Sequence, residues 1–245
     1  MVLKRKRESY KDLKIEHGVF DEHTLMTLYR LMSKNDISVE SMLEEGKEAV
    51  VLSGVTKQKE WVAIKVYRIE ACDFKKMWKY LVGDPRFSLM SKRTRTVVKL
   101  WCQREFKNMK IAQKAGVNCP KPLAVQDNVL IMSFIGDNGI LAPRLIDIMP
   151  DKPEELYKMI LENLKKLVHV GLVHGDLSAY NILLWDEPYF IDFSQGTTMK
   201  NQNALELLKR DIKNINSYFS KLNVAVKDPE DIFNDLIKLI KLKSE

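Results

Sequence analysis

Residues 172–184 read LVHGDLSAYNILL and decide how the rest of the chain is interpreted. Within them His174, Asp176 and Asn181 form an HxDxxxxN pattern between two short apolar runs, which predicts a loop held between strands. Such polar residues are often only turn or cap residues. The fixed spacing and the apolar flanks favour a reaction centre instead.

A second acidic motif supports that interpretation. Asp192 lies between Ile191 and Phe193, after a short apolar run. In the phosphoryl-transfer template of protein kinases, the first aspartate positions or deprotonates the attacking hydroxyl. The asparagine five residues later binds a metal ion, and a following aspartate coordinates magnesium against the phosphates. We therefore predict Asp176 as catalytic and Asn181 and Asp192 as metal ligands.

Two charged residues in apolar surroundings point to the same chemistry. Lys65 lies inside the strand-like run 61–67, and Glu105 lies on the apolar stripe of a helix predicted over 95–115. Each charge is costly there unless it is paired. A strand lysine paired with a helix glutamate is how protein kinases hold nucleotide phosphates, so we predict a Lys65–Glu105 ion pair.

The predicted nucleotide site includes a loop and a connector. Residues 45–51 read EGKEAVV, with one glycine where a phosphate-covering loop usually has three, and they precede the lysine strand. The apolar run 129–135 is predicted as a core strand whose end faces adenine. The predicted ATP-binding residues are Gly46, Lys47, Glu48, Ala49, Val51, Lys65, Glu105, Met132, Phe134 and Ile135.

Changes of periodicity predict an α+β, bilobal protein kinase-like fold with a sheet-rich N-lobe and a reduced helical C-lobe. Residues 1–40 are interpreted as an N-terminal extension with a helix, 41–135 as the N-lobe and 136–245 as the C-lobe. The C-lobe is expected to contain a helix from Pro153 to Gly171, strands at 182–184 and 189–191, and two C-terminal helices.

Composition and charge limit the class of protein, its partners and its location in the cell. The hydrophobic content of 45% is typical of a globular protein, and the net charge of +7 makes a polyanionic partner plausible. Basic residues cluster at Lys4–Arg7, at Lys75 and Lys76, and at Lys92–Arg95. The three cysteines have no CxxC spacing, and no apolar run is long enough to cross a bilayer. We expect a cytoplasmic protein without a membrane anchor.

Five segments together carry a family resemblance. They read GKEA at 46–49, AIKVY at 63–67, WCQRE at 101–105, LVHGDLSAYN at 172–181 and IDFSQ at 191–195. The chain resembles the RIO family of atypical serine kinases from about residue 40 to 220. The first branch of that family fits better than the second, because some 44 residues before the loop are too few for the winged-helix domain of the second branch.

The resemblance implies an ATP-dependent kinase or ATPase that uses Mg²⁺, or Mn²⁺, and acts in maturation of the small ribosomal subunit. Its partners would be the pre-ribosomal small subunit and ribosomal RNA. It assigns Asp176 as catalytic, Lys65 as phosphate-binding, and Asp192 both as a metal ligand and as an acceptor of phosphate. Ala179 departs from the family, which usually has an acidic residue there.

Some features of ordinary protein kinases are missing. Gly175 replaces the arginine that senses a phosphorylated activation loop, no APE-like anchor follows Asp192, and only 53 residues remain after it. This favours an ATPase switch or autophosphorylation over a kinase with many protein substrates.

Two rival functions are open at this point. Small-molecule kinases and Bud32-like kinases share the His-Gly-Asp and Asn pattern. The short C-terminal region argues against the former, and residues 178–180 with Ser194 and Gln195 argue against the latter. A nucleotide-sensing assembly factor on ribosomal RNA would bind ATP without turning it over.

Lys65→Ala should weaken productive ATP binding, because the phosphate contact is lost and Glu105 is left without its partner on an apolar stripe. Glu105→Gln should have a milder effect. Calorimetry with Mg-ATP and a turnover assay test this prediction. Wild-type affinity and turnover in Lys65→Ala would show that the assigned ion pair is wrong.

Overall fold

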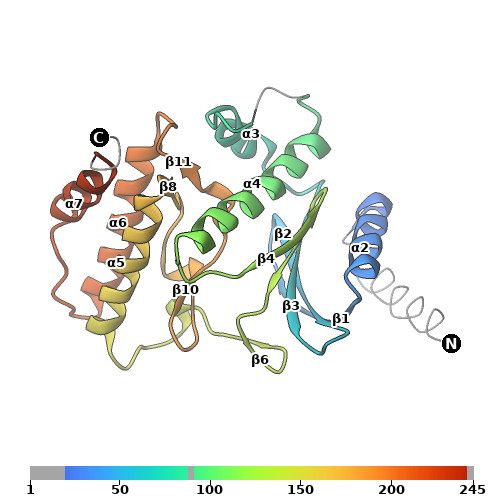
Figure 1. Cartoon of the computed structure of the whole chain (residues 1–245), viewed down its shortest axis with the longest axis horizontal. Coiled ribbons are helices and arrows are strands. Elements are labelled where there is room, and N and C mark those ends of the chain that lie inside the picture. The colour runs from blue at the N-terminus through green and yellow to red at the C-terminus, as the bar shows by residue number, and fades with distance from the viewer. Residues whose placement is uncertain (1–19, 88–90, 242–245) are drawn as a thin grey trace. The chain divides into compact units, whose positions relative to one another are not determined.

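A computed structural model describes residues 20–87 and 91–241 of the chain, and in this range the protein forms two compact units (Figure 1). The first unit contains the described residues up to Trp78, together with 91–103 and 123–134. The second unit contains 79–87, 104–122 and 135–241. The lobe boundaries predicted at 40/41 and 135/136 stay predictions, and the basic cluster Lys4–Arg7 lies outside the described residues.

The first unit is built on a five-stranded sheet. Its strands follow the order β1-β2-β3-β5-β4, and the pairs β1–β2, β2–β3 and β3–β5 are antiparallel. The bounds are β1 Ile37–Glu45, β2 Ala49–Thr56, β3 Trp61–Tyr67, β4 Pro122–Gln126 and β5 Val129–Ser133. Strands β2 and β3 form a hairpin, and β3 coincides with the strand-like run 61–67 that the sequence indicated.

One helix, α2 (Glu22–Lys34), covers a face of this sheet with apolar residues from its own stripe. The Asp21 side chain caps its N-terminus by accepting a hydrogen bond from the Thr24 amide at 3.1 Å. Buried Asn128 donates to Thr24 Oγ1 at 2.9 Å and to the Tyr67 carbonyl at 2.7 Å, which fastens the helix to the strands. The shared core consists of Leu28, Leu31, Ile37, Val50, Leu52, Val62, Ile64, Val66, Val129 and Ile131.

Within residues 20–133, β1, β4 and α3 (Phe74–Val82) were not predicted from the sequence. Strand β1 reads ISVESMLEE, and its register shifts twice against β2, so its polar and apolar residues do not alternate cleanly. The strand predicted over 129–135 ends at Ser133, two residues earlier than expected. Short or bulged strands depend on their neighbours for pairing, which local sequence does not report.

Helix α4 (Thr94–Lys114) agrees with the predicted helix to within one residue at each end. Its residues up to 103 belong to the first unit and those from Arg104 to the second. Gly116 has a φ of +73°, the left-handed conformation that commonly follows a helix end. The predicted stripe is buried along its whole length and comprises Val98, Cys102, Glu105, Met109 and Ala112.

Helices dominate the second unit, as predicted. They are α5 (Pro153–His169), α6 (Ala204–Lys221) and α7 (Pro229–Lys241), and α7 packs against both others (Figure 1). Tyr157 joins α5 to α6, since its ring lies 5.2 Å from that of Phe219 and its hydroxyl donates to Asn216 at 2.8 Å. Within the described residues, 20–87 and 91–241, no helix is long enough and apolar enough to cross a bilayer.

Three short two-stranded antiparallel sheets complete the second unit. They pair β6 (Gly136–Asp137) with β7 (Ile140–Leu141), β8 (Leu172–Val173) with β11 (Thr197–Thr198), and β9 (Ile182–Leu184) with β10 (Pro188–Phe190). Strand β10 begins and ends one residue before the predicted strand 189–191. A sheet-rich first unit and a helical second unit confirm the predicted α+β class.

Candidate active site

The HxDxxxxN segment forms a loop that leaves β8 at His174. His174 is fully buried, and its Nε2 lies 3.0 Å from the Ile191 carbonyl oxygen. Because a carbonyl can only accept, Nε2 is the donor in this bond. The imidazole also packs 4.7 Å from the ring of Phe193. His174 therefore ties the loop to the strand end that carries Asp192.

Gly175 has a structural reason to be glycine. Its φ is +76°, and a Cβ atom at this position would lie 2.9 Å from the Gln195 carbonyl oxygen. Any other side chain would combine backbone strain with a clash against main chain. The missing arginine noted in the sequence thus reflects the close approach of residues 193–196.

The Asp176 carboxylate is oriented by neighbouring amide side chains. Gln195 Nε2 donates to Asp176 Oδ2 at 2.8 Å, and Asn181 Nδ2 donates to the Asp176 carbonyl oxygen at the same distance. The Asp176 side chain remains 43% exposed, and Arg210 Nη2 lies 4.0 Å from its Oδ1. A carboxylate held in one orientation and open to solvent can serve an incoming hydroxyl group.

Asn181 and Asp192 lie at the same end of the β9–β10 hairpin. Ile182 pairs with Phe190, and the Ile191 amide donates to the Asn181 carbonyl oxygen at 3.0 Å. Asp192 has a left-handed backbone conformation, with φ 59° and ψ 67°. Its carboxylate accepts a hydrogen bond from the Ser194 amide at 3.4 Å. A polar side chain tolerates this conformation better than a bulky one.

These two side chains fit a magnesium ion. The amide nitrogen of Asn181 is bound to Asp176, which leaves the amide oxygen to act as a ligand. Carboxylate and amide oxygens are the hard ligands that Mg²⁺ prefers, and it usually takes few from protein and the rest from phosphate and water. Accordingly, the described residues contain no cluster of three or more His, Cys, Asp or Glu that could hold a metal by itself.

Asp211 on α6 is a site residue that the sequence analysis missed. It is fully buried and accepts hydrogen bonds from the Gly175 and Leu177 amides, both at 2.8 Å. Burial raises its pKa to about 7, against the opposite effect of the two backbone N–H groups. A carboxylate on the buried stripe of Leu208 and Ile212 was the available signal, of the same kind as Glu105.

Arg104 and Asn108 on α4 hold the segment after Asp192. Arg104 Nε donates to the Gly196 carbonyl oxygen at 2.9 Å, and Asn108 Nδ2 donates to the Phe193 and Gly196 carbonyl oxygens at 2.8 and 2.7 Å. Both side chains are fully buried. Asp84 lies 3.5 Å from Arg104 and supplies the opposite charge, and burial lowers the pKa of Arg104 to about 10.

In the first unit, the predicted phosphate loop is a tight turn between β1 and β2. The Gly46 amide donates to the Ala49 carbonyl oxygen at 2.9 Å. Arg68 braces the turn, with its amide bound to the Glu48 carbonyl oxygen at 2.9 Å and its Nη1 bound to that of Gly46 at 3.3 Å. The side chain of Lys47, between Gly46 and Glu48 in the turn, is exposed.

Lys65 lies in the middle of the same sheet. On β3 it is 8% exposed and faces Val51 on β2 and Leu130 on β5 in the strand register. Met132 lies at the end of β5, and the Phe134 ring lies 6.0 Å from that of Trp61.

The predicted site residues thus divide between the two units. The first unit contains the predicted residues on the sheet and its turn, from Gly46 to Phe134. The second unit contains the remaining ones, which are Glu105, Ile135, Asp176, Asn181 and Asp192. Glu105 is 1% exposed on α4. Because Lys65 and Glu105 belong to different units, their ion pair stays a prediction.

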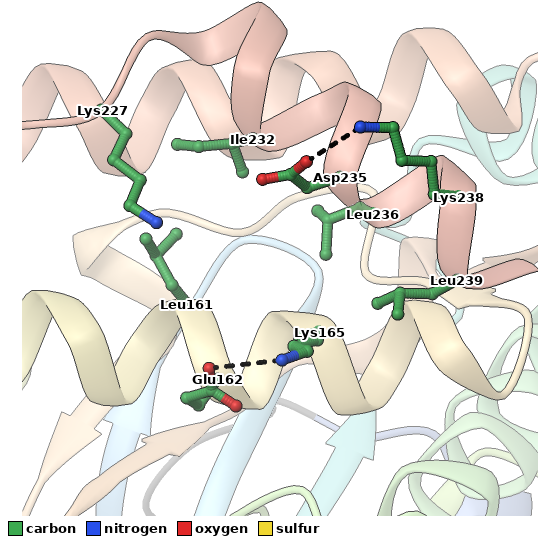
Figure 2. A pocket seen from close by; sticks show the side chains of 9 residues that line it. All are labelled: Leu161, Glu162, Lys165, Lys227, Ile232, Asp235, Leu236, Lys238 and Leu239. Carbon is green, nitrogen blue, oxygen red and sulfur yellow. Dashed lines mark hydrogen bonds and ion pairs between the residues drawn. The ribbon is translucent and has the colours of Figure 1, made fainter.

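A separate hollow of about 370 Å³ lies between α5 and α7 (Figure 2). Leu161, Ile232, Leu236 and Leu239 line it, with the ion pairs Glu162–Lys165 and Asp235–Lys238 at its edges. These ion pairs are exposed to solvent and therefore contribute little to the stability of the fold. None of the predicted site residues lines this hollow.

Comparisons with known proteins agree with one another. The RIO domain pattern matches residues 50–232. The RIO-type serine/threonine-protein kinase Rio1 of Methanocaldococcus jannaschii is 43% identical over 98% of this chain and 81% of its own length. The Haloferax volcanii protein of the same name is 40% identical over 85% of this chain and 72% of its own length.

A solved structure shares the fold. The Rio2 kinase of Chaetomium thermophilum, solved as an ADP/Mg²⁺-phosphoaspartate complex, has a TM-score of 0.71 and 21% identity. The match covers 92% of this chain and 67% of that one. At this identity the likeness establishes a kinase-like fold.

Asp211→Asn should lower the free energy of unfolding by about 1–3 kcal/mol, because its new NH₂ group faces one of the two loop amides. The folded protein raises the pKa of Asp211 from 3.8 to about 7. The stabilisation of the folded state by Asp211 is therefore fully present below pH 3.8 and is lost as pH rises through 7. The stability difference from wild type should therefore shrink between pH 4 and 8 in urea titrations.

Asp235→Asn is the matched control, because Asp235 is an exposed aspartate on α7. Its unfolding free energy should follow that of wild type at every pH. A difference between wild type and Asp211→Asn that stays constant or grows with pH would contradict the role assigned to Asp211.

Proposed function

Since this chain belongs to the RIO family of atypical serine/threonine protein kinases, we propose that it transfers the γ-phosphoryl group of ATP to a serine or threonine hydroxyl. The observation that carries the proposal is the placement of Asp176, Asn181 and Asp192. All three lie on one loop and one hairpin end of the second unit, where Asp211, Arg104 and Asn108 hold the backbone.

Asp176 acts on the acceptor. Its carboxylate orients the hydroxyl and accepts its proton while the hydroxyl oxygen bonds to the γ-phosphorus. The bond from that phosphorus to the β,γ-bridging oxygen breaks, and ADP leaves with the electron pair. The hydrogen bond from Gln195 already fixes the carboxylate, so little reorganisation is needed when the acceptor arrives.

Asn181 and Asp192 would hold the metal, through an amide oxygen and a carboxylate. Bound Mg²⁺ supplies neutralisation of the charge that develops on the phosphates. We extend the proposal to Mn²⁺, which prefers the same oxygen ligands.

In the first unit we assign ATP binding to the turn and the sheet. Lys65 is the proposed phosphate ligand, because its strand pairs with the one that follows the turn, and protein kinases carry their phosphate-binding lysine on such a strand. The main chain at Gly46–Ala49 is the proposed phosphate cover. The proposed adenine contacts are Met132, Phe134 and the next residue, Ile135, which belongs to the second unit. Glu105 is proposed to orient Lys65.

We further propose that Asp192 itself accepts phosphate. Its carboxylate oxygen would attack the γ-phosphorus, ADP would leave, and water would then hydrolyse the acyl-phosphate. The sum of these steps is ATP hydrolysis. The phosphoaspartate in the Rio2 complex named above supports this extension.

For the cellular role we propose a cytoplasmic function in maturation of the small ribosomal subunit, with ribosomal RNA as a partner. The net charge of +7 supports binding to a polyanion. Lys75, Lys76, Lys92 and Arg93 are all exposed in the first unit. Arg95 is instead paired with Asp21 at 3.0 Å, so we leave it out of the proposed RNA contacts.

Substitution of the two aspartates should separate their roles. Asp176→Asn should keep Mg-ATP binding and lower turnover by about 100-fold or more, because the proton acceptor is lost. Asp192→Asn should weaken Mg-ATP binding itself. Calorimetry measures binding, and labelled ATP separates protein-bound label from free phosphate. Full turnover in Asp176→Asn would overturn the catalytic assignment.

The same labelled protein tests the acyl-phosphate. Hydroxylamine should release label from Asp192, whereas label on serine survives the treatment. Label that is entirely resistant would remove the phosphoaspartate but leave the kinase proposal standing. ATP binding with neither bound label nor free phosphate would instead indicate a nucleotide sensor without turnover.

Binding to structured RNA should weaken as salt rises, because each neutralised phosphate contributes a slope of about −0.9 in log K against log salt. Reversing the charge of Lys92 and Arg93 together should make that slope shallower by about 2. Reversing Lys213 and Lys221, exposed on α6, is the control with the same change in net charge. Equal slopes for both double variants would reject a specific basic surface.

A further inference from the structure

A small polar cavity lies beside the catalytic loop in the second unit. Its volume is about 240 Å³. Lys79 and Tyr80 line it from the end of α3, and Asn201, Asn203, Glu206 and Arg210 line it from the start of α6 and the turn before it. None of the site residues predicted from the sequence belongs to this lining.

Arg210 joins the cavity to the reaction centre. Its Nη2 donates to the Gly175 carbonyl oxygen and lies 4.0 Å from Asp176 Oδ1. The neighbouring residue, Asp211, holds the amides of the same loop. The cavity therefore shares a wall with the residue that is proposed to activate the acceptor hydroxyl.

The charges in the lining favour an anionic ligand. Lys79 and Arg210 are two exposed cations, and Glu206 is the single carboxylate. Within the described part of the chain, Lys79 forms no ion pair. Arg210 has five N–H donors, of which the bond to Gly175 uses one. A carboxylate or phosphate group would receive charge-assisted hydrogen bonds from both cations.

The amide groups of the lining have different tasks. Asn201 is 7% exposed, donates to Thr197 Oγ1 at 3.1 Å and accepts from the Asn203 amide at 2.9 Å, so it forms the wall of the cavity. Asn203 has an exposed side chain that can donate to a ligand. The cavity is smaller than the usual 300–1,000 Å³ of small-molecule sites, which suits one acidic side chain.

We propose that this cavity binds an acidic side chain of the acceptor protein, so that the enzyme prefers serine or threonine in acidic segments. The proposal rests on the function proposed above. An extended chain advances about 3.3–3.6 Å per residue, and Arg210 lies 4.0 Å from Asp176. The acidic residue is therefore the one next to the acceptor or the second from it.

Peptides with one serine flanked by Asp, by Asn or by Lys test the preference. Wild-type protein should have a kcat/KM about 3- to 10-fold higher for the Asp peptide than for the Asn peptide. Lys79→Glu should abolish that ratio and raise the value for the Lys peptide. A peptide flanked by phosphoserine separates a phosphate preference from a carboxylate preference.

Lys213→Glu is the matched control, since Lys213 is exposed on the same helix as Arg210 and is not part of the cavity lining. It should keep the wild-type ratio. A ratio near one in wild-type protein would overturn the proposal. Equal loss of the ratio in Lys213→Glu and Lys79→Glu would also overturn it, because the effect would then be general electrostatics.

A binding measurement separates this proposal from the proposed function. A labelled Asp peptide with Ala in place of serine should bind wild-type protein in fluorescence anisotropy and bind Lys79→Glu about 3- to 10-fold more weakly. If no peptide were phosphorylated, the transfer reaction would fail while this measurement still decided the cavity. Equal binding to both proteins would refute the acidic subsite.

Discussion

The buried carboxylate of Asp211 is the constraint on which the catalytic half of this protein depends. It accepts hydrogen bonds from the amides of Gly175 and Leu177. These two bonds leave the backbone around Asp176 little freedom to move. Removing a carboxylate from water is costly, so the interaction persists only because both oxygens find donors. With the loop fixed, Asp176 is presented to solvent at one position rather than over a range.

The segment around Asp192 is held by an equally buried set of contacts. Arg104 and Asn108 bind three carbonyl groups of residues 193–196, and Gly175 allows the Gln195 carbonyl to approach where a Cβ atom would collide. That approach also places the Gln195 side chain on Asp176. One tightly packed turn thus positions the aspartate proposed to bind the metal and orients the one proposed to be catalytic, which is the preorganisation that phosphoryl transfer requires.

The small polar cavity adds a function for a helix that the catalytic template does not explain. Arg210 connects the cavity to the Gly175 carbonyl, so an acidic ligand there would sit against the same loop that Asp211 anchors. Substrate choice and loop geometry would then depend on adjacent residues of α6.

The sequence by itself determined the elements whose signals are local. Repeating apolar positions revealed α4 and α5, a β-branched run revealed β3, and the fixed spacing of His174, Asp176 and Asn181 revealed the loop. Lys65 and Glu105 were conspicuous because a charge in an apolar pattern is visible without knowing its partner.

Only the tertiary structure decided the contacts that hold the site. Asp211 and Gly175 are 36 residues apart, and Arg104 and Gly196 are 92 residues apart. No periodicity links such positions, because their pairing depends on how the helices and the turn pack together. The choice of Gly175, the hydrogen bond from Gln195 to Asp176 and the cavity beside Arg210 all follow from that packing.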